Sequence, residues 1–210
     1  MVKIITVSQQ KGGAGKTAIA AQLAGVWASS GKKVMLVDSD PQGSLAAWHA
    51  LRADDGAPQL AAIDCEKVEG WKVSSLVGKA KRTHDYVVID TAPHAETAAR
   101  TAVREADLVV IPVQPTAPDL WASRATFDLA SGEKKPYLVV LNRLPARGKL
   151  ADEIIAQLKA DDHPVCNATL GNRTAFATAF ARGRAAHELG ASKAADEAKA
   201  LARAVSRAIK

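Results

Sequence analysis

A short glycine-rich run near the start of the chain has the residue types that bind phosphate. Residues 10–17 read Gln-Lys-Gly-Gly-Ala-Gly-Lys-Thr. Its glycines, which allow positive φ angles and close approach of an anion, are Gly12, Gly13 and Gly15. Successive N–H groups of such a loop form a concave cradle for phosphate oxygens. Lys16 adds a charge for the β- and γ-phosphates, and the Thr17 hydroxyl is a ligand for Mg²⁺.

The elements on either side of this run are those that a phosphate loop needs. Residues 3–8 alternate as a strand does, and residues 17–30 read as a helix. A helix starting near Lys16 would add the positive end of its dipole to the anion site. Strand, glycine-rich loop, Lys-Thr and helix together predict a P-loop.

The loop also carries a second lysine. The common P-loop pattern begins with glycine, whereas this chain has Gln10 followed by Lys11. Lys-Gly-Gly-x-Gly-Lys-Thr resembles the deviant Walker A motif of the ParA/MinD family of ATPases. The resemblance implies that Lys11 reaches across a nucleotide-sandwich dimer to the partner's phosphates. The alternative is a glycine-rich surface turn with two solvated lysines.

Two acidic residues follow the next apolar segment. Residues 34–37 read as a buried strand and end in Asp38-Ser39-Asp40-Pro41-Gln42-Gly43. Ligand chemistry in α/β folds is placed at the carboxyl ends of parallel strands. The run resembles the second acidic motif of the same family, which assigns Asp40 to the attacking water and Asp38 to the Mg²⁺ and phosphate environment. The alternative is that both acids only cap the following helix.

Two further strands end in candidate site residues. Residues 86–89 are apolar and close with Asp90, the Walker B pattern that delivers a carboxylate to Mg²⁺. The following Thr91–His94 keeps one proline and is interpreted as a second switch, in which His94 is a phosphate sensor or a plain exposed histidine. Residues 137–141 are followed by Asn142, which the resemblance assigns to the adenine and which is also a common turn residue.

The resemblance gives a full set of candidate residues. The catalytic candidates are Lys11, Lys16 and Asp40. The nucleotide-binding candidates are Gly12, Gly13, Ala14, Gly15, Lys16, Thr17, Ala18 and Asn142. The metal candidates are Thr17, Asp38 and Asp90, so the cofactors that it implies are ATP and Mg²⁺.

The arrangement of apolar segments predicts an α/β fold, with a mostly parallel twisted sheet and helices on both faces. At 210 residues we expect a single P-loop ATPase domain, 1–210, without an N-terminal helix-turn-helix domain. A fifth strand spans 108–113, and a sixth is expected at 164–167. Helices are expected at 17–30, 43–52, 72–82, 95–105, 119–131, 149–160, 172–182 and 191–209. Asp119 is a candidate N-cap, and Trp27, Trp48, Trp71 and Trp121 are expected to be packing residues.

Several function classes are disfavoured by composition. No secretory signal and no apolar run of membrane-spanning length occur, so a cytoplasmic protein without a membrane partner is expected. Cys65 and Cys166 lack the spacing of a metal or redox motif, which indicates reduced thiols and no structural metal.

Positive charge is concentrated at the end of the chain. Residues 173–210 hold eight basic and three acidic residues, a net +5 of the whole chain's +6. With few aromatic residues between them, such charges predict non-specific, salt-sensitive phosphate contact rather than base stacking. The resemblance points to DNA binding, for which we choose Arg173, Arg182 and Arg184. The alternative is a solvated helix face, and the alanine-rich apolar side of that helix disfavours a membrane surface.

We therefore expect a small ParA-type ATPase that positions a cargo. The resemblance implies an ATP-bound homodimer on nucleoid DNA, whose slow hydrolysis is stimulated by a ParB-like or cargo-adaptor protein. One alternative is a metabolic ATP-dependent enzyme of the same fold, although neither cysteine suits an iron–sulfur reductase and no acceptor motif is seen. Another is a nucleotide-gated regulator with negligible hydrolysis, for which Ala18 and the altered Thr91–His94 loop leave room.

Overall fold

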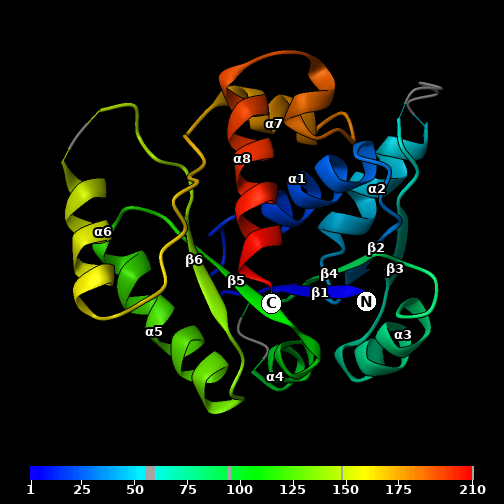
Figure 1. Ribbon diagram of the computed structural model, residues 1–210, viewed down its shortest axis with the longest axis horizontal. Helices are drawn as coiled ribbons and strands as arrows, with labels where there is room; N and C mark the ends of the chain where they lie inside the picture. Colours follow the sequence, from blue (N-terminus) through cyan, green and yellow to red (C-terminus); the bar gives the residue numbers. More distant parts are fainter. Residues whose placement is uncertain (55–59, 94–95, 148, 210) are drawn as a thin grey trace.

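Six parallel strands form the centre of the molecule, in the order β3-β2-β4-β1-β5-β6 (Figure 1). The structure is a computed structural model that describes residues 1–54, 60–93, 96–147 and 149–209. The strands are β1 (Lys3–Val7), β2 (Val34–Asp38), β3 (Asp64–Lys67), β4 (Tyr86–Asp90), β5 (Leu108–Val113) and β6 (Tyr137–Leu141). The parallel sheet predicted from the sequence is confirmed.

Helices cover both faces of this sheet. The described helices are α1 (Lys16–Ser29), α2 (Ser44–Asp54), α3 (Val73–Ala80), α4 (Glu96–Glu105), α5 (Ala117–Gly132), α6 (Leu150–Ala160), α7 (Thr174–Phe180) and α8 (Lys193–Ala208), with 3₁₀ turns η1 (Gly70–Lys72) and η2 (Ala186–Leu189). One apolar core joins α1, α2 and α8 to the sheet, and two others join α3, α4, α5 and α6 to its opposite face. Figure 1 shows the same division, with α8 crossing above the strands and α4 below them.

The central strands are buried on both faces because their sequences are apolar throughout. Every residue of β2, β4 and β5 is buried, as is β1 after its first residue. Successive residues of a strand point to opposite faces. Ile5 of β1 accordingly packs in the core under α1, whereas Ile4 packs in the core under α3. This is the pattern expected of a parallel sheet covered by helices on both sides.

The prediction of a strand at 164–167 is wrong. Val165 makes only an isolated parallel bridge to Val139 of β6, through N–H···O bonds of 2.8 Å on either side of that residue. The sixth strand is β3, at the other edge of the sheet. Its residues are polar and mostly exposed, so no apolar run announces it, and pairing with β2 forms it instead.

The packing role expected of the tryptophans holds for two of the four. Trp27 and Trp48 are buried, at 5% and 0% exposure. Trp71 and Trp121 are 72% and 65% exposed, so the prediction for them is wrong. Among the described residues, no helix has both the length and the apolar character needed to cross a bilayer.

Candidate functional site

The register of three central strands brings the candidate site residues to one edge of the sheet. Val7, the last residue of β1, pairs with Asp90 of β4, and Asp90 pairs in turn with Asp38 of β2. The P-loop follows β1 and leads into α1. The strands that carry Asp38 and Asp90 therefore end level with β1, where the phosphate loop begins, as the positions of these residues in the sequence predicted.

The P-loop backbone is shaped by two glycines and held by two amides. Gly13 and Gly15 have φ angles of +79° and +98°, whereas Gly12 is not among the positive-φ residues. Gly15 is also constrained by space, since a Cβ there would lie 2.1 Å from the Asn142 side-chain nitrogen. That nitrogen donates to the Ala14 carbonyl at 2.8 Å, and Gln114 donates to the Gly13 carbonyl at 2.8 Å. With its carbonyls bound outward, the loop keeps its N–H groups available for an anion.

Lys16 is the buried cation of the loop. It is only 6% exposed, and its Nζ donates to the Lys11 carbonyl at 3.3 Å. Burial lowers the pKa of this ammonium, and the carboxylates of Asp90 and Asp40 oppose that shift. A phosphate chain in the loop would supply the negative charge that a buried ammonium favours.

Thr17 and Asp90 form a pair of oxygen ligands beside the loop. Thr17 Oγ1 donates to Asp90 Oδ2 at 2.6 Å, while Asp90 Oδ1 is buried without a hydrogen-bond partner among the described residues. Burial raises the pKa of Asp90 to about 7, against the lowering effect of the Thr17 hydrogen bond. Mg²⁺ prefers such hard oxygen ligands, so the unpartnered carboxylate oxygen fits a metal that arrives with nucleotide.

The two acids after β2 differ in what they contact. Asp38 accepts N–H groups with both oxygens, from Asp40 at 3.1 Å and from Ala46 in α2 at 2.9 Å. Asp38 therefore contacts the first turn of α2, and its assignment to the Mg²⁺ and phosphate environment stays a prediction. Asp40 accepts the Gln42 N–H through Oδ1 at 2.9 Å and lines the pocket.

The second lysine is paired within its own chain. Lys11 Nζ lies 2.5 Å from Asp119 Oδ2, and the Lys11 side chain is 37% exposed. The prediction that Asp119 is the N-cap of α5 is wrong. Thr116 is the N-cap, accepting the Asp119 N–H and donating its own hydroxyl to Asp119 Oδ2 at 2.5 Å. The other oxygen, Asp119 Oδ1, is buried without a hydrogen-bond partner among the described residues.

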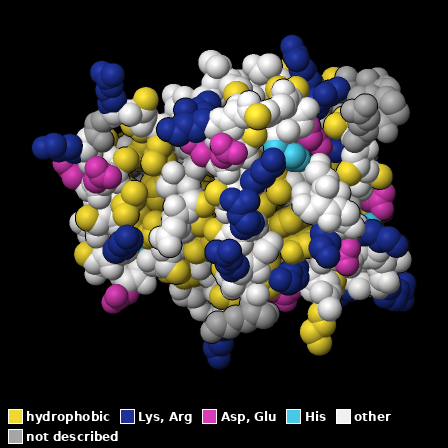
Figure 2. Space-filling model, turned by 45° about the horizontal axis from the view of Figure 1, so that its top comes forward, with side chains coloured by type: hydrophobic (Ala, Val, Ile, Leu, Met, Phe, Trp, Pro, Cys, Tyr) yellow, Lys and Arg dark blue, Asp and Glu magenta, His cyan; other side chains and the backbone are white. Residues whose placement is uncertain are grey.

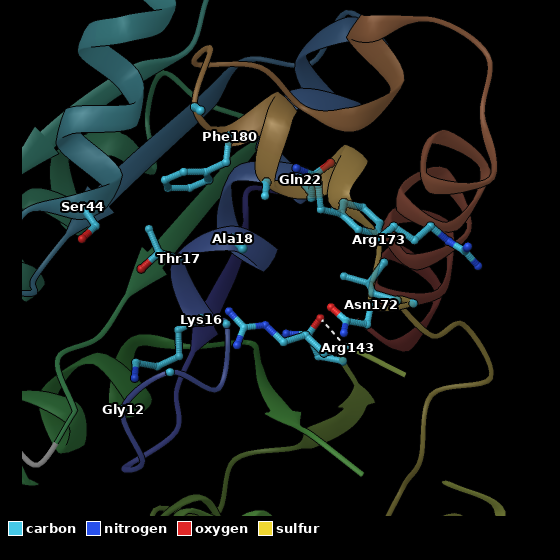
Figure 3. A pocket seen from close by; sticks show the side chains of 18 of the residues that line it. Gly12, Lys16, Thr17, Ala18, Gln22, Ser44, Arg143, Asn172, Arg173 and Phe180 are labelled. Atoms are coloured by element: carbon cyan, nitrogen blue, oxygen red, sulfur yellow. Dashed lines mark hydrogen bonds between the residues drawn. The ribbon is translucent and has the colours of Figure 1, made fainter. Parts of the chain in front are cut away.

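A pocket of about 610 Å³ opens above the P-loop (Figure 3). Beyond the loop, its walls come from alternate residues of the acidic loop (Asp40, Gln42 and Ser44), Asn142 and Arg143, residues 170–173, and the side of α7 that carries Phe176 and Phe180. Phosphates on the loop would leave the nucleoside to fill the part toward residues 170–173 and α7. Arg143, Phe176 and Phe180 were missed from the sequence. Only the position of Arg143, directly after Asn142, gave a signal.

The predicted DNA-binding arginines lie in different surroundings. Arg173 lines the pocket and forms two hydrogen bonds with Glu197 of α8, at 2.9 and 2.6 Å. Arg182 is exposed, and Arg184 is half-buried with its carbonyl accepting the Trp48 indole N–H at 3.3 Å. His94, predicted to be either a phosphate sensor or an exposed histidine, lies outside the described residues.

The segment that carries Arg182 and Arg184 is tied to α2. The Arg52 guanidinium of α2 donates to both carboxylate oxygens of Glu188, at 2.8 and 2.7 Å, and both side chains are 5% exposed. Gly183, with φ +64°, packs so closely against α2 that a Cβ would lie 2.2 Å from the backbone nitrogen of Arg52. The helix after the acidic loop and the basic segment therefore form one packed unit.

Comparisons with known proteins agree with this geometry. The model of the CobQ/CobB/MinD/ParA nucleotide binding domain matches residues 5–186. The chain is 31% identical to maintenance of carboxysome distribution protein A from Halothiobacillus neapolitanus, over 92% of this chain and 91% of that protein. It is also 31% identical to the chromosome-partitioning ATPase Soj from Thermus thermophilus, over 76% of each chain.

Solved structures share the fold. Apo McdA from Cyanothece superposes with a TM-score of 0.79 at 19% identity, over the whole of both chains. MinD from Pyrococcus horikoshii, in complex with Mg-ADP, gives a TM-score of 0.80 at 20% identity, covering 98% of this chain and 96% of that one.

Proposed function

The chain belongs to the CobQ/CobB/MinD/ParA family of nucleotide-binding domains, and we propose that it is an ATPase that works as a nucleotide-dependent dimer on DNA to position a cargo. One observation carries the proposal: beside the pocket lined by Lys16, Thr17 and Asp40, the P-loop carries a second lysine, Lys11. The first three have the chemistry to bind a nucleotide and position water within one protomer, whereas the partly exposed Lys11, held there by Asp119, can also serve a neighbouring protomer.

In the proposed hydrolysis, the protein supplies position and charge. The N–H groups of residues 12–18 hold the phosphates, and Lys16 neutralises the γ-phosphate as its bond to the bridging oxygen breaks. Asp40 orients the attacking water, whose oxygen forms the new bond to phosphorus. Mg²⁺ would be held by Thr17 and Asp90, with Asp38 in its immediate environment, and when bound it would shield the phosphate charge.

The dimer is proposed from Lys11. An ammonium that is 37% exposed can leave its intrachain partner Asp119 and reach a neighbouring protomer's phosphates. ATP would thus join two protomers across their P-loops, and ADP would release them. Hydrolysis is expected to be slow until a ParB-like or cargo-adaptor protein completes the site.

Non-specific DNA is the proposed surface on which the dimer works. Besides Arg182, three exposed basic residues of α8 lie four residues apart and so share one helix face: Lys199, Arg203 and Arg207. Figure 2 shows Lys and Arg side chains running down the middle of this face of the molecule. We favour these residues over Arg173, because the Arg173 guanidinium is engaged by Glu197. Such an interface would place the protein on the nucleoid.

The kind of cargo is proposed from the relatives. The 31% identity to maintenance of carboxysome distribution protein A extends over 92% of this chain, which supports a protein compartment as cargo. The similarity to Soj, a chromosome-partitioning ATPase, supports DNA as the other candidate. In both cases a partner on the cargo would stimulate hydrolysis.

The first test is binding to random-sequence duplex DNA with ATP, with ADP and without nucleotide, at two salt concentrations. Binding only with ATP, and weaker at high salt, is expected. Glutamine at all three α8 positions should flatten the salt dependence of log Kobs by about 3 for each protomer that contacts the DNA, roughly one unit for each phosphate that is no longer neutralised. A control triple removes the same charge near α6, at Arg147, Lys149 and Lys159. DNA binding that ignores nucleotide, or equal losses of affinity in both triples, would contradict the proposed interface.

A further inference from the structure

Arg143 has a backbone conformation that an arginine adopts only at a cost. Its φ is +54°, in the left-handed region that favours glycine and asparagine. The other non-glycine residues with positive φ among those described are Lys134 and Asp162. Both follow a helix, α5 and α6, where a left-handed residue is a common way to end the helix. Arg143 follows strand β6 instead, so helix termination does not explain it.

The conformation is held in place by the neighbouring asparagine. The Arg143 N–H donates to the Asn142 side-chain oxygen at 2.9 Å, and the Asn142 amide nitrogen is bound to the Ala14 carbonyl of the P-loop at 2.8 Å. The start of the Arg143 side chain is thus fixed relative to the phosphate loop. Strained backbone held in this way is concentrated at functional sites.

The side chain points into the nucleotide pocket. In Figure 3 it extends from the end of β6 across the start of α1, toward Lys16 and Ala18. Within the described part of the chain, its guanidinium has no hydrogen-bond or ion-pair partner, and the residue is exposed. Arg173, on the opposite wall, differs because its guanidinium is bound by Glu197. Arg143 therefore presents unused donors to a pocket built for an anion.

We propose that Arg143 is a nucleotide-positioning residue whose guanidinium binds the α-phosphate of ATP or ADP. This inference rests on the proposed function, since it assumes that the β- and γ-phosphates lie on residues 12–17. The next phosphate then lies near the first turn of α1, over which the Arg143 side chain extends. A planar guanidinium matches two phosphate oxygens, and the pair is charge-assisted.

The test separates the side chain from the backbone strain. In Arg143→Gly the strain is removed together with the guanidinium, so the melting temperature without nucleotide should stay equal or rise. Binding of fluorescent ATP and ADP should nevertheless weaken, both by about 10- to 100-fold, as expected when a hydrogen bond to a charged group is removed. The nucleotide affinity of Arg143→Lys, which keeps a point charge, should lie between that of Arg143→Gly and that of the unaltered protein. Lys134→Gly makes the same backbone change after α5 and should leave nucleotide affinity unaltered.

Inorganic tripolyphosphate identifies the group that is bound. In Arg143→Gly, tripolyphosphate should compete less well with fluorescent ATP than it does in the unaltered protein. The loss should equal that seen when unlabelled ATP is the competitor, because tripolyphosphate also has a phosphate in the α position. Unchanged tripolyphosphate competition with weakened ATP would overturn the α-phosphate assignment in favour of the sugar or base. Equal ATP affinity in Arg143→Gly and the unaltered protein would overturn the whole inference. If the unaltered protein bound no nucleotide, the proposed function itself would fail.

Discussion

Asp119→Asn should strengthen the proposed ATP-dependent dimer. Lys11 Nζ lies 2.5 Å from Asp119 Oδ2 in a single protomer, and Asp119 is only 3% exposed. If Lys11 serves the partner's phosphates, this ion pair must open once in each protomer before the dimer closes. Asparagine keeps the size of the side chain and an oxygen for the Thr116 hydroxyl, but it holds the ammonium less strongly.

The size of the effect follows from the exposure of the pair. An ion pair with one solvated partner contributes at most about 1 kcal/mol, the upper end for exposed pairs. Two such pairs open per dimer, so the variant avoids a cost of about 2 kcal/mol. At about 1.4 kcal/mol for each factor of ten, the dimer dissociation constant should fall roughly 30-fold.

Sedimentation equilibrium with ATP measures this constant, in an Asp40→Ala background so that nucleotide is not consumed. Lys11→Ala should be monomeric, and the double variant Lys11→Ala/Asp119→Asn should be monomeric as well, because no lysine remains to be released. A dimer that is unchanged or weaker in Asp119→Asn, with an unaltered melting temperature, would refute the reasoning.

Three further outcomes test the site and its support. Asp90→Asn should stabilise the nucleotide-free protein at pH 8 but hardly at pH 4, as thermal melts at both pH values would show. Burial raises the folded-state pKa of Asp90 from 3.8 to about 7, so the carboxyl begins to oppose folding as the pH rises above about 4 and opposes it fully above about 7. Gly183→Ala should lower the free energy of unfolding in urea by about 3 kcal/mol, because the added Cβ would meet the Arg52 backbone. Gly31→Ala is the control: Gly31 has φ +78° and open space around it, so the loss should be about 1 kcal/mol. Equal losses in the two variants would contradict the clash. Arg52→Met should cost about 3–5 kcal/mol by leaving Glu188 buried and unpaired, and Arg52→Met/Glu188→Leu should recover much of that stability in the same assay.

Features of the fold with a local signal were predictable. Apolar runs identified β1, β2, β4, β5 and β6, since burial on both faces requires such runs. Strand β3 was missed because pairing with β2, and not its own composition, makes it a strand. Residues 164–167 contain the apolar pair Val165 and Cys166 between Pro164 and Asn167, and only Val165 pairs with β6.

The candidate site shows the same limit. Thr17 and Asp90, 73 residues apart, could be placed together because each ends a recognisable motif. The Lys11–Asp119 contact spans 108 residues, and nothing in the sequence around Asp119 distinguishes a lysine partner from a helix cap. Arg143 was passed over because its importance depends on a dihedral angle. Contacts set by tertiary packing, such as Gly183 against Arg52, leave no pattern in sequence spacing.

The two edges of the sheet determine how copies of this chain can join. At one edge, β3 presents Asp64, Glu66 and Lys67 to solvent, charges that discourage a second strand from docking. At the other edge, the bridges of Val139 to Val165 and of Leu144 to Gly171 occupy some of the hydrogen-bonding groups of β6 and of the segment that follows it. Both features disfavour growth of the sheet from molecule to molecule, which is the route to fibres. The proposed dimer would accordingly join through loops and helices, whose contacts a bound nucleotide would make and break within one catalytic cycle.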